Sequence, residues 1–313
     1  MELTRNFKNL NKEDVLIAGG KGASLGEMTQ AKILVPRGFV VLASAFERFL
    51  EESDLNVEIE ALLYKKVNLK DVNSIDRVSN EIRDLILDAE LSEDIGKKIK
   101  KEFSKLKTKY VAVRSSATAE DSSVASWAGE LESYLNTTKN NLLENIKKCW
   151  ASLFTPRAIF YRFEKNLDRM RISVAVVVQK MIQSEISGIC FTVHPITKDK
   201  NQMVIEAGWG LGEAIVGGKI TPDTYVISKK DWIILDTNIN QQKMMIVGSK
   251  AGVKEVVVSK SKQSKQKLSG KQIIQLAKLC QKIENHYGFP VDIEWAIEKD
   301  KIYITQSRPI TTL

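Results

Sequence analysis

The stretch Val-Asp-Ile-Glu-Trp-Ala-Ile (291–297), followed after Lys299-Asp300 by Ile-Tyr-Ile-Thr-Gln (302–306), decides the fold of the C-terminal half. β-Branched and aromatic residues dominate both runs, which is typical of strands. The short polar interruption predicts a tight turn between them. We therefore expect an antiparallel hairpin close to the end of the chain.

The same hairpin carries the strongest candidate site. Asp292 and Glu294 are two residues apart, as are Gln306 and Arg308, so each pair faces one side of its strand. Normal pairing would bring all four together, with hard oxygen ligands that suit Mg²⁺ and an arginine that can neutralise a β- or γ-phosphate. The alternative is two surface strands bearing a salt bridge. Apolar neighbours argue for one core face and one cleft face instead: Ile293, Trp295 and Ile304.

Upstream of the hairpin, helical and strand patterns alternate. Residues 269–287 predict an amphipathic helix ended by Gly288 and Pro290, and the lysine-rich segment 254–268 predicts an exposed loop. Residues 55–110 predict a helical hairpin, with apolar stripes at Ile75, Val78, Ile82, Leu85 and Ile86 and at Ile95, Ile99, Phe103 and Leu106, and with Ser92 capping the second helix. Further strands are expected at 111–113, 174–178, 188–192 and 203–207. The mixture predicts an α+β fold.

A glycine-rich segment, Gly19-Gly20-Lys21-Gly22-Ala23-Ser24-Leu25-Gly26-Glu27, lies near the beginning. Glycines allow backbone amides to approach phosphate, a helix starting near Ala23 would direct its positive end at it, and Lys21 adds a cation. The spacing is not that of a Walker loop or a dinucleotide fingerprint. On spacing alone, a plain helix-capping turn with a solvated lysine is favoured.

A second segment, Val113-Arg114-Ser115-Ser116-Ala117, is followed by Glu120-Asp121-Ser122 and Trp127-Ala128-Gly129-Glu130. An arginine that leaves a strand into small hydroxyl residues can hold phosphate with two hydrogen bonds, and Gly129 would let the chain close over a nucleotide. Pairing of Arg114 with Glu120 or Asp121 is an equal alternative.

Two further segments are open to interpretation. The strand end Gln179-Lys180-Met181-Ile182 could give adenine an apolar slot with backbone donors and acceptors, although an ordinary core strand is favoured from the pattern. The glycine-rich run from Glu206 to Glu213 predicts either a mobile flap over phosphates or a structural turn.

Composition narrows the class of protein. Of 313 residues, 43% are hydrophobic and 27% charged, and the net charge of +8 suits a polyanionic ligand. Three scattered cysteines predict neither a disulfide framework nor a zinc site. The polar start and short apolar runs predict a cytoplasmic chain without a membrane partner. Aromatic residues are not interleaved with basic ones, which argues against nucleic acid, and both histidines, His194 and His286, are expected to be structural.

Six segments in order resemble the N-terminal ATP-binding domain of the phosphoenolpyruvate synthase and pyruvate phosphate dikinase family. They are GGKGASLGEM, VPRGFVV, VAVRSSATAEDSSVASWAGELESYLN, VVVQKMIQSEISGICFTVHPIT, IEAGWGLGEAIVGGKITPDTYV and DIEWAI with YITQSRPIT. The resemblance covers residue 5 to the end and reverses the preference for a plain capping turn at Lys21. It implies an ATP-grasp fold with ATP between two lobes, residues 1–180 and 181–313.

The resemblance also implies roles for single residues. Phosphates would be held by Lys21, Arg114 and Arg308, with Gly129 and Ser133 in the phosphate-side loop. Adenine would be bound by Gln179, Lys180, Met181 and Ile182. Magnesium would be held near Asp292, Glu294 and Gln306, the last two being favoured as direct ligands.

In this family ATP phosphorylates a histidine on a separate domain, which carries the phosphoryl group to a pyruvate-binding domain, and the synthases release AMP and phosphate. Neither His194 nor His286 matches that histidine motif. The resemblance therefore implies an ATP-dependent phosphotransferase module of the pyruvate, water dikinase type, with the histidine and pyruvate-binding domains supplied in trans. There are two alternatives. One is a module that phosphorylates another acceptor, as in rifampicin phosphotransferase. The other is a nucleotide-binding module without turnover.

Overall fold

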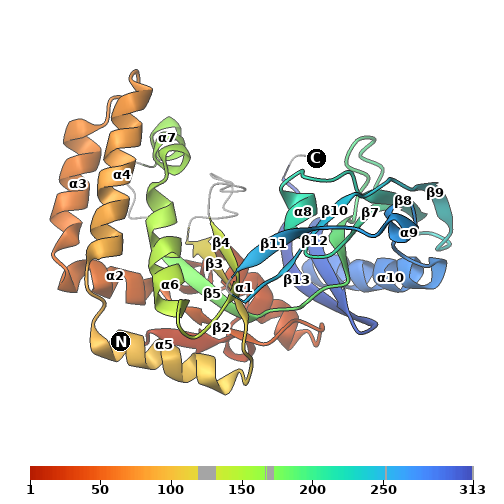
Figure 1. Ribbon diagram of the computed structural model, residues 1–313, viewed down its shortest axis with the longest axis horizontal. Helices are drawn as coiled ribbons and strands as arrows, with labels where there is room; N and C mark the ends of the chain where they lie inside the picture. The colour runs from red at the N-terminus through yellow and green to blue at the C-terminus, as the bar shows by residue number, and fades with distance from the viewer. Residues whose placement is uncertain (119–131, 166, 168–172, 251, 312–313) are drawn as a thin grey trace. The chain divides into compact units, whose positions relative to one another are not determined.

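The computed structural model describes residues 1–118, 132–165, 167, 173–250 and 252–311. Contacts within the chain divide it into two compact units. The first comprises Met1–Glu27 and Arg37–Lys180, and the second comprises Met28–Pro36 and Met181–Leu313. Each unit has its own sheet and its own covering helices (Figure 1), so the predicted α+β class is confirmed.

The sheet of the first unit is antiparallel throughout, with strand order β1-β2-β5-β3-β4. Its central strand, β5, is almost entirely apolar because it is buried on both faces. The strands are β1 (Thr4–Asn6), β2 (Gly38–Val41), β3 (Val111–Ala117), β4 (Ser133–Thr137) and β5 (Val174–Lys180).

Most helices of this unit pack on one face of the sheet and enclose the main core. The core joins Val111, Val113 and Val176 of the strands to the apolar stripes of the helices. The helices and helical turns of this part of the chain are η1 (Phe7–Asn9), α1 (Val15–Gln30), α2 (Ala43–Glu52), α3 (Leu55–Lys66), α4 (Val72–Asp88), α5 (Glu93–Lys105), α6 (Leu142–Ala151), η2 (Ser152–Phe154) and α7 (Pro156–Glu164).

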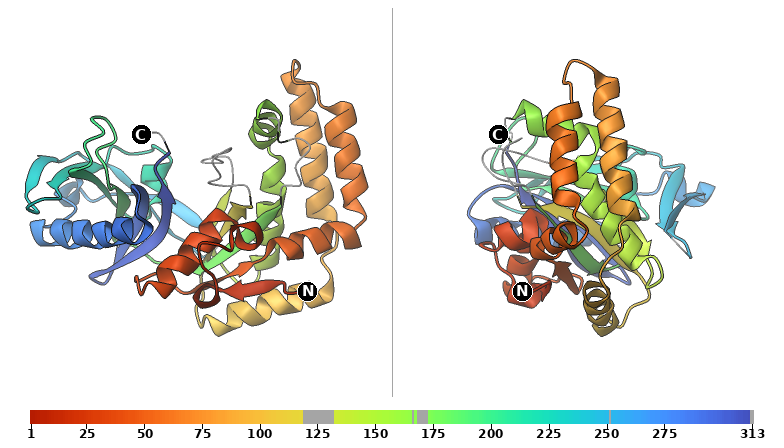
Figure 2. Two further views of the ribbon diagram at one scale, coloured as in Figure 1. Left: turned by 180° about the vertical axis from the view of Figure 1, so that it is seen from behind. Right: turned by 90° about the vertical axis from the view of Figure 1, so that its left-hand side faces the viewer.

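The predicted apolar stripes are confirmed, since Ile82, Ile86, Ile95 and Ile99 are fully buried. The prediction of a two-helix hairpin over 55–110 is wrong, because this stretch forms three helices, α3, α4 and α5. Figure 2 shows α3 and α4 side by side, where they pack along their lengths. Ser92 does precede α5, but its hydroxyl makes no capping hydrogen bond.

The sheet of the second unit has the strand order β13-β12-β6-β7-β8-β9, again antiparallel, with β10 and β11 forming a separate ribbon. The predicted hairpin is confirmed as β12 paired with β13, and Lys299 and Asp300 both have positive φ, as a tight hairpin turn requires. The strands are β6 (Ile186–Phe191), β7 (Gln202–Trp209), β8 (Asp223–Ser228), β9 (Ile234–Asn238), β10 (Met244–Gly248), β11 (Val253–Val257), β12 (Val291–Glu298) and β13 (Lys301–Pro309).

Helix α10 (Gly270–Tyr287) contacts β7, β8 and β12 of this sheet (Figure 1). Ser269 and Gln272 form a reciprocal capping box at its start, and Gly288 ends it with φ 78°. Its buried residues, including Leu276 and Cys280, meet a sheet face that includes Cys190 and Ile205, all fully buried. This packing leaves the opposite face of the sheet for polar side chains.

The exposed loop predicted over 254–268 is wrong. This segment completes β11, forms the short helix α9 (Lys260–Gln263) and buries Val258, Lys267 and Leu268. The lysine-rich composition predicted exposure, but one of these lysines, Lys267, is buried in an ion pair with Asp223. Among the described residues, no helix combines the length and apolar character needed to cross a membrane.

Candidate functional site

The glycine-rich turn of the first unit is built around the hydroxyl of Ser116. Gly19 interrupts α1 with φ 69° and ψ 169°, a conformation that favours glycine. A β-carbon at Gly19 would lie 2.2 Å from both the carbonyl oxygen and Oγ of Ser116. Ser116 Oγ donates to the Ala18 carbonyl at 3.0 Å and accepts from the Gly22 amide at 3.2 Å. Strand β3 therefore fixes the turn that carries Lys21.

The helix after this turn resumes at Gly20, so the expected start near Ala23 is wrong by about a turn. The amide of Gly22 bonds to Ser116, which means that part of the positive helix end is capped by the protein itself. Lys21 lies on the first turn of this helix. Burial raises the pKa of the nearby Cys149 thiol, Glu132 adds to the increase, and the Lys21 ammonium opposes it.

Strand register places the other candidates of this unit on one face of the sheet. Gln179 pairs with Ala112 of β3, and Arg114 pairs with Val177 of β5 and with Ser133 of β4. Since successive residues alternate between faces, Arg114, Ser116 and Gln179 lie on the same side. This side is opposite to the helical core, and Ser116 links it to the Lys21 turn. Gly129 lies outside the described residues, as do Glu120 and Asp121.

The Gln179 side chain is 2% exposed, and its Nε2 has no hydrogen-bond partner among the described residues. A buried amide donor without an acceptor is costly, so it suits a ligand with an acceptor atom. The Lys180 amide donates to the Arg37 carbonyl at 2.7 Å and is occupied. Met181 and Ile182 are both buried and belong to the second unit.

In the second unit, the four hairpin residues predicted to converge do lie together. Asp292 pairs with Arg308, and Glu294 pairs with Gln306, across β12 and β13. Nε and Nη2 of Arg308 approach Asp292 Oδ2 at 2.8 and 2.7 Å. The salt bridge of the alternative interpretation therefore exists, but β12 is an inner strand and Asp292 is buried.

Sequence reasoning missed one carboxylate on this face, Glu206 of β7. Ile189 of β6 pairs with Glu206 on one side and with Glu294 on the other. The pairing of β6 with β12 joins segments about a hundred residues apart, which no local pattern indicates. Alternation along β7 could show only that Glu206 and Val204 share a face.

The charges on this face repel one another. Burial raises the pKa of Glu206, and the Asp292 carboxylate raises it further. Burial also raises the pKa of Asp292, which Arg308 lowers and Glu294 raises. A bound cation would relieve this repulsion.

The donor set fits a hard divalent cation. Gln306 is 6% exposed, and its Oε1 is buried without a hydrogen-bond donor among the described residues. Amide and carboxylate oxygens are the ligands that Mg²⁺ accepts. Within the described ranges, no three His, Cys, Asp or Glu side chains already surround one metal position. The fit thus depends on the carboxylate–amide pair of Glu294 and Gln306.

The glycine-rich run 206–213 forms a firmly bonded turn. The Gly210 carbonyl accepts from the hydroxyls of Ser184 and Ser187 at 2.9 and 2.6 Å. Gln242 accepts from the Trp209 amide and donates to the Trp209 carbonyl, as a neighbouring strand would. Short helix α8 (Glu213–Val216) follows. These bonds favour the structural turn over the flap.

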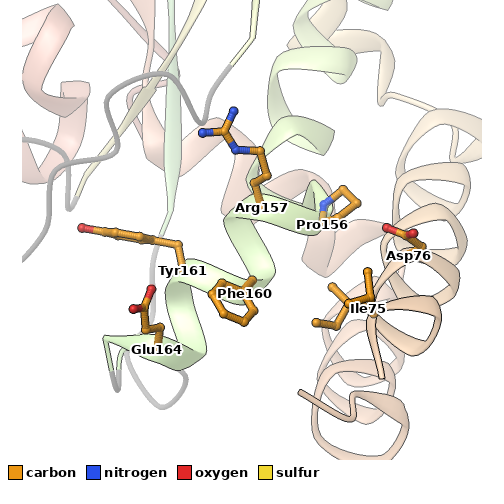
Figure 3. Close-up of a pocket in the computed structure, with 8 residues that line it drawn as sticks. Ile75, Asp76, Pro156, Arg157, Phe160, Tyr161 and Glu164 are labelled. Atoms are coloured by element: carbon orange, nitrogen blue, oxygen red, sulfur yellow. The ribbon is translucent and has the colours of Figure 1, made fainter. Parts of the chain in front are cut away.

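A surface pocket of about 380 Å³ lies between α4 and α7 (Figure 3). Ile75 and Phe160 are among its apolar lining residues, and Asp76, Arg157 and Glu164 carry its charges. None of the candidate nucleotide residues lines it. It belongs to the helical layer on the far side of the first sheet, so it is separate from the candidate site.

The chain is similar to known ATP-binding proteins over nearly its whole length. Residues 15–313 match the family described as pyruvate phosphate dikinase, AMP/ATP-binding domain. The chain is 45% identical over 312 residues to a probable phosphoenolpyruvate synthase of Methanocaldococcus jannaschii, covering 97% of this chain and 26% of that protein. It is 40% identical to the phosphoenolpyruvate synthase of Pyrococcus furiosus, covering 98% and 43%. It is also 40% identical to the rifampicin phosphotransferase of Bacillus subtilis, covering 99% and 36%. The chain thus spans less than half the length of these relatives.

Proposed function

We propose, because this chain belongs to the pyruvate phosphate dikinase AMP/ATP-binding domain family, that it binds ATP with Mg²⁺ and transfers a phosphoryl group from it. A histidine on a separate domain or partner chain accepts the β-phosphoryl group and water accepts the γ-phosphoryl group, so AMP and phosphate are released. The reaction is that of the pyruvate, water dikinase type.

The observation that carries this proposal is a pair of buried amide atoms, one in each unit, that have no hydrogen-bond partner among the described residues. Gln179 Nε2 is a donor and Gln306 Oε1 is an acceptor, and each lies on the polar face of its own sheet. A nucleotide base offers acceptors to the first, and a metal ion offers positive charge to the second. Buried polar atoms without a partner are uncommon in folded proteins, and a bound ligand or ion is one way in which such an atom is satisfied.

Residues of the first unit, together with Met181 and Ile182 that directly follow it in the sequence, would bind and orient ATP. Lys21 and Arg114 would hold phosphate oxygens, with Gly129 and Ser133 in the phosphate-side loop. Gln179 would bind the adenine edge, and Lys180, Met181 and Ile182 would border the base. Because the Lys180 amide already donates to the Arg37 carbonyl, a backbone donor to adenine from this segment would come from Met181 or Ile182.

In the second unit, Glu294 and Gln306 would hold Mg²⁺, with Asp292 beside them. Bound Mg²⁺ supplies charge neutralisation of the phosphate oxygens during transfer. Asp292 orients Arg308 through their salt bridge, and Arg308 would stabilise charge on the transferring group.

The second candidate is transfer to another acceptor. It is supported by the relative named rifampicin phosphotransferase, whose similarity covers 99% of this chain. Both candidates share the ATP-binding residues, so they differ only in the acceptor that a partner domain presents. A nucleotide-binding module without turnover would have less need of the paired carboxylate, amide and arginine.

The test mixes the chain with Mg²⁺, ATP labelled at the β-phosphate, and a phosphohistidine domain from the family. We expect label on the histidine and release of AMP. Lys21→Ala should lower the apparent ATP affinity at least about 10-fold, the loss of one charge-assisted phosphate contact.

Lys8→Ala is the matched control, because Lys8 is an exposed lysine of the same unit. It should behave as the wild type. Absence of AMP and of phosphohistidine, together with unchanged ATP binding by Lys21→Ala, would overturn the proposal. Turnover with rifampicin but not with the histidine domain would select the second candidate.

A further inference from the structure

A single row of side chains crosses the polar face of the second sheet. Strand register aligns one residue from each of β8, β7, β6, β12 and β13. In that order they are Thr224, Glu206, Ile189, Glu294 and Gln306. Glu206 therefore stands in the same row as the two residues best suited to hold Mg²⁺.

Glu206 faces away from the core of the second unit. Its neighbours along β7, Ile205 and Ala207, are fully buried, as are Cys190 and Ile293 of the adjoining inner strands. These residues lie on the face that packs against α10. A glutamate here has no role in that packing, so its position needs another explanation.

The charges on the polar face of the sheet explain the position of Glu206. The carboxylates of Glu206, Asp292 and Glu294 all lie on this face, and the Arg308 guanidinium is bonded to Asp292. Independently, Gln306 Oε1 is buried at the end of the same row, with no hydrogen-bond donor in the part of the chain that the structure describes. An acidic row that ends in an unpaired oxygen acceptor is completed by a divalent cation and its water ligands.

We propose that Glu206 is a further positioning residue of the divalent-cation site, in addition to Glu294 and Gln306. This inference rests on the proposed function. Two strand spacings of about 4.8 Å separate the backbones of Glu206 and Glu294. Glu206 therefore acts by accepting a hydrogen bond from water bound to the cation, and it does not replace Glu294 as a ligand.

The test measures Mn²⁺ as a probe of the site, using electron paramagnetic resonance in the presence of the non-hydrolysable ATP analogue AMP-PNP. Glu206→Gln keeps the shape and removes the charge. We expect it to weaken Mn²⁺ binding about 10- to 100-fold, as loss of an outer-sphere partner does. The spectrum of bound Mn²⁺ should change in line shape, which a purely structural role would not cause.

Two reference variants calibrate the result. Glu255→Gln removes an exposed carboxylate of the same unit that pairs with Lys219, and it should bind Mn²⁺ within about twofold of wild type. Glu294→Gln should lose more affinity than Glu206→Gln. AMP-PNP affinity without metal and the melting temperature without metal should not fall in Glu206→Gln.

The outcomes distinguish failure of the proposed function from failure of the role of Glu206 alone. If wild type shows no Mn²⁺ site with AMP-PNP, the proposed function itself fails. If wild type and Glu294→Gln behave as expected while Glu206→Gln matches Glu255→Gln, the role of Glu206 alone is overturned.

Discussion

Single hydroxyl and amide groups decide how the candidate residues are held. Ser116 is the clearest case, because one Oγ both donates to Ala18 and accepts from Gly22. It therefore stabilises a glycine turn that lies nearly a hundred residues earlier in the sequence. The proposed contact of Lys21 with phosphate therefore depends on the conformation of this turn.

We predict that Ser116→Ala lowers both stability and ATP affinity. It leaves a buried carbonyl and a buried amide without their partner, at a cost of about 1–3 kcal/mol. Urea unfolding and ATP titration measure the two effects. Ser104→Ala is the control, because its hydroxyl bonds within an exposed helix, and it should stay within about 0.5 kcal/mol. Normal ATP affinity in a destabilised Ser116→Ala would show that the turn does not position Lys21.

The acidic face of the second sheet predicts a pH effect. The pKa values of Glu206 and Asp292 are raised above their ordinary 4.5 and 3.8 in the folded chain. The folded state thus binds these protons more tightly than the unfolded state. Their contribution to stability is present at low pH and is lost as pH rises through the raised pKa values.

We expect the metal-free wild type to lose stability relative to Glu206→Gln as pH rises from about 4 to 8, since the variant lacks one of the two titrations. Melting temperatures of both proteins, measured in a chelator across this range, give the difference. A constant difference would mean that Glu206 is not under electrostatic stress. Added Mg²⁺ should reduce the effect by neutralising the face.

At the scale of elements, a buried ion pair attaches the segment before α10 to β8. Lys267 Nζ lies 2.7 Å from Asp223 Oδ1 and 2.6 Å from the Asn240 carbonyl oxygen. Asp223 Oδ2 also accepts from the Lys267 amide and the Tyr225 hydroxyl, both at 3.0 Å. Neither charged side chain is exposed.

We predict that Lys267→Met destabilises the chain by about 3–5 kcal/mol, because it leaves the Asp223 carboxylate buried without its cation. Denaturant unfolding measures the loss. Lys265→Met, two residues away and exposed, is the matched control and should change little. A loss under 1 kcal/mol would show that water reaches Asp223.

This ion pair also shows where sequence patterns stop being informative. Periodicity predicts the stripe Ile95, Ile99 and Phe103 and the hairpin of β12 and β13, because both depend on neighbours in sequence. The segment 254–268 reads as solvated because Lys267 is a lysine, and only its pairing with Asp223, 44 residues away, reverses that. Composition carries no information about such a partner.

The candidate site also contains some residues that local sequence predicts and others that depend on tertiary pairing. Asp292 with Glu294, and Gln306 with Arg308, could be predicted to converge from two-residue spacing and one local turn. Glu206 could not, because its place in the same row as Glu294 depends on β6 pairing with both β7 and β12. Ser116 stood in a noted motif, but its bond to Gly22 depends on tertiary packing of α1 on β3.

At the scale of the whole molecule, ligand binding and stability are linked. A ligand that binds only the folded chain at 100 times its Kd adds about 2.7 kcal/mol to the free energy of unfolding. We predict that ATP with Mg²⁺ raises the melting temperature of the wild-type chain without any acceptor present. The effect requires binding alone, so it tests the chain separately from turnover.

One variant in each unit then identifies which part of the ligand is held where. Lys21→Ala should reduce the stabilisation both with and without Mg²⁺, because it removes a contact to phosphate. Glu294→Gln should abolish the extra stabilisation that Mg²⁺ adds and leave that of metal-free ATP intact. Calorimetry of the two variants against wild type makes the comparison. If Glu294→Gln and wild type respond identically to Mg²⁺, the metal is not held by the β12–β13 hairpin, and the assignment of Gln306 fails with it.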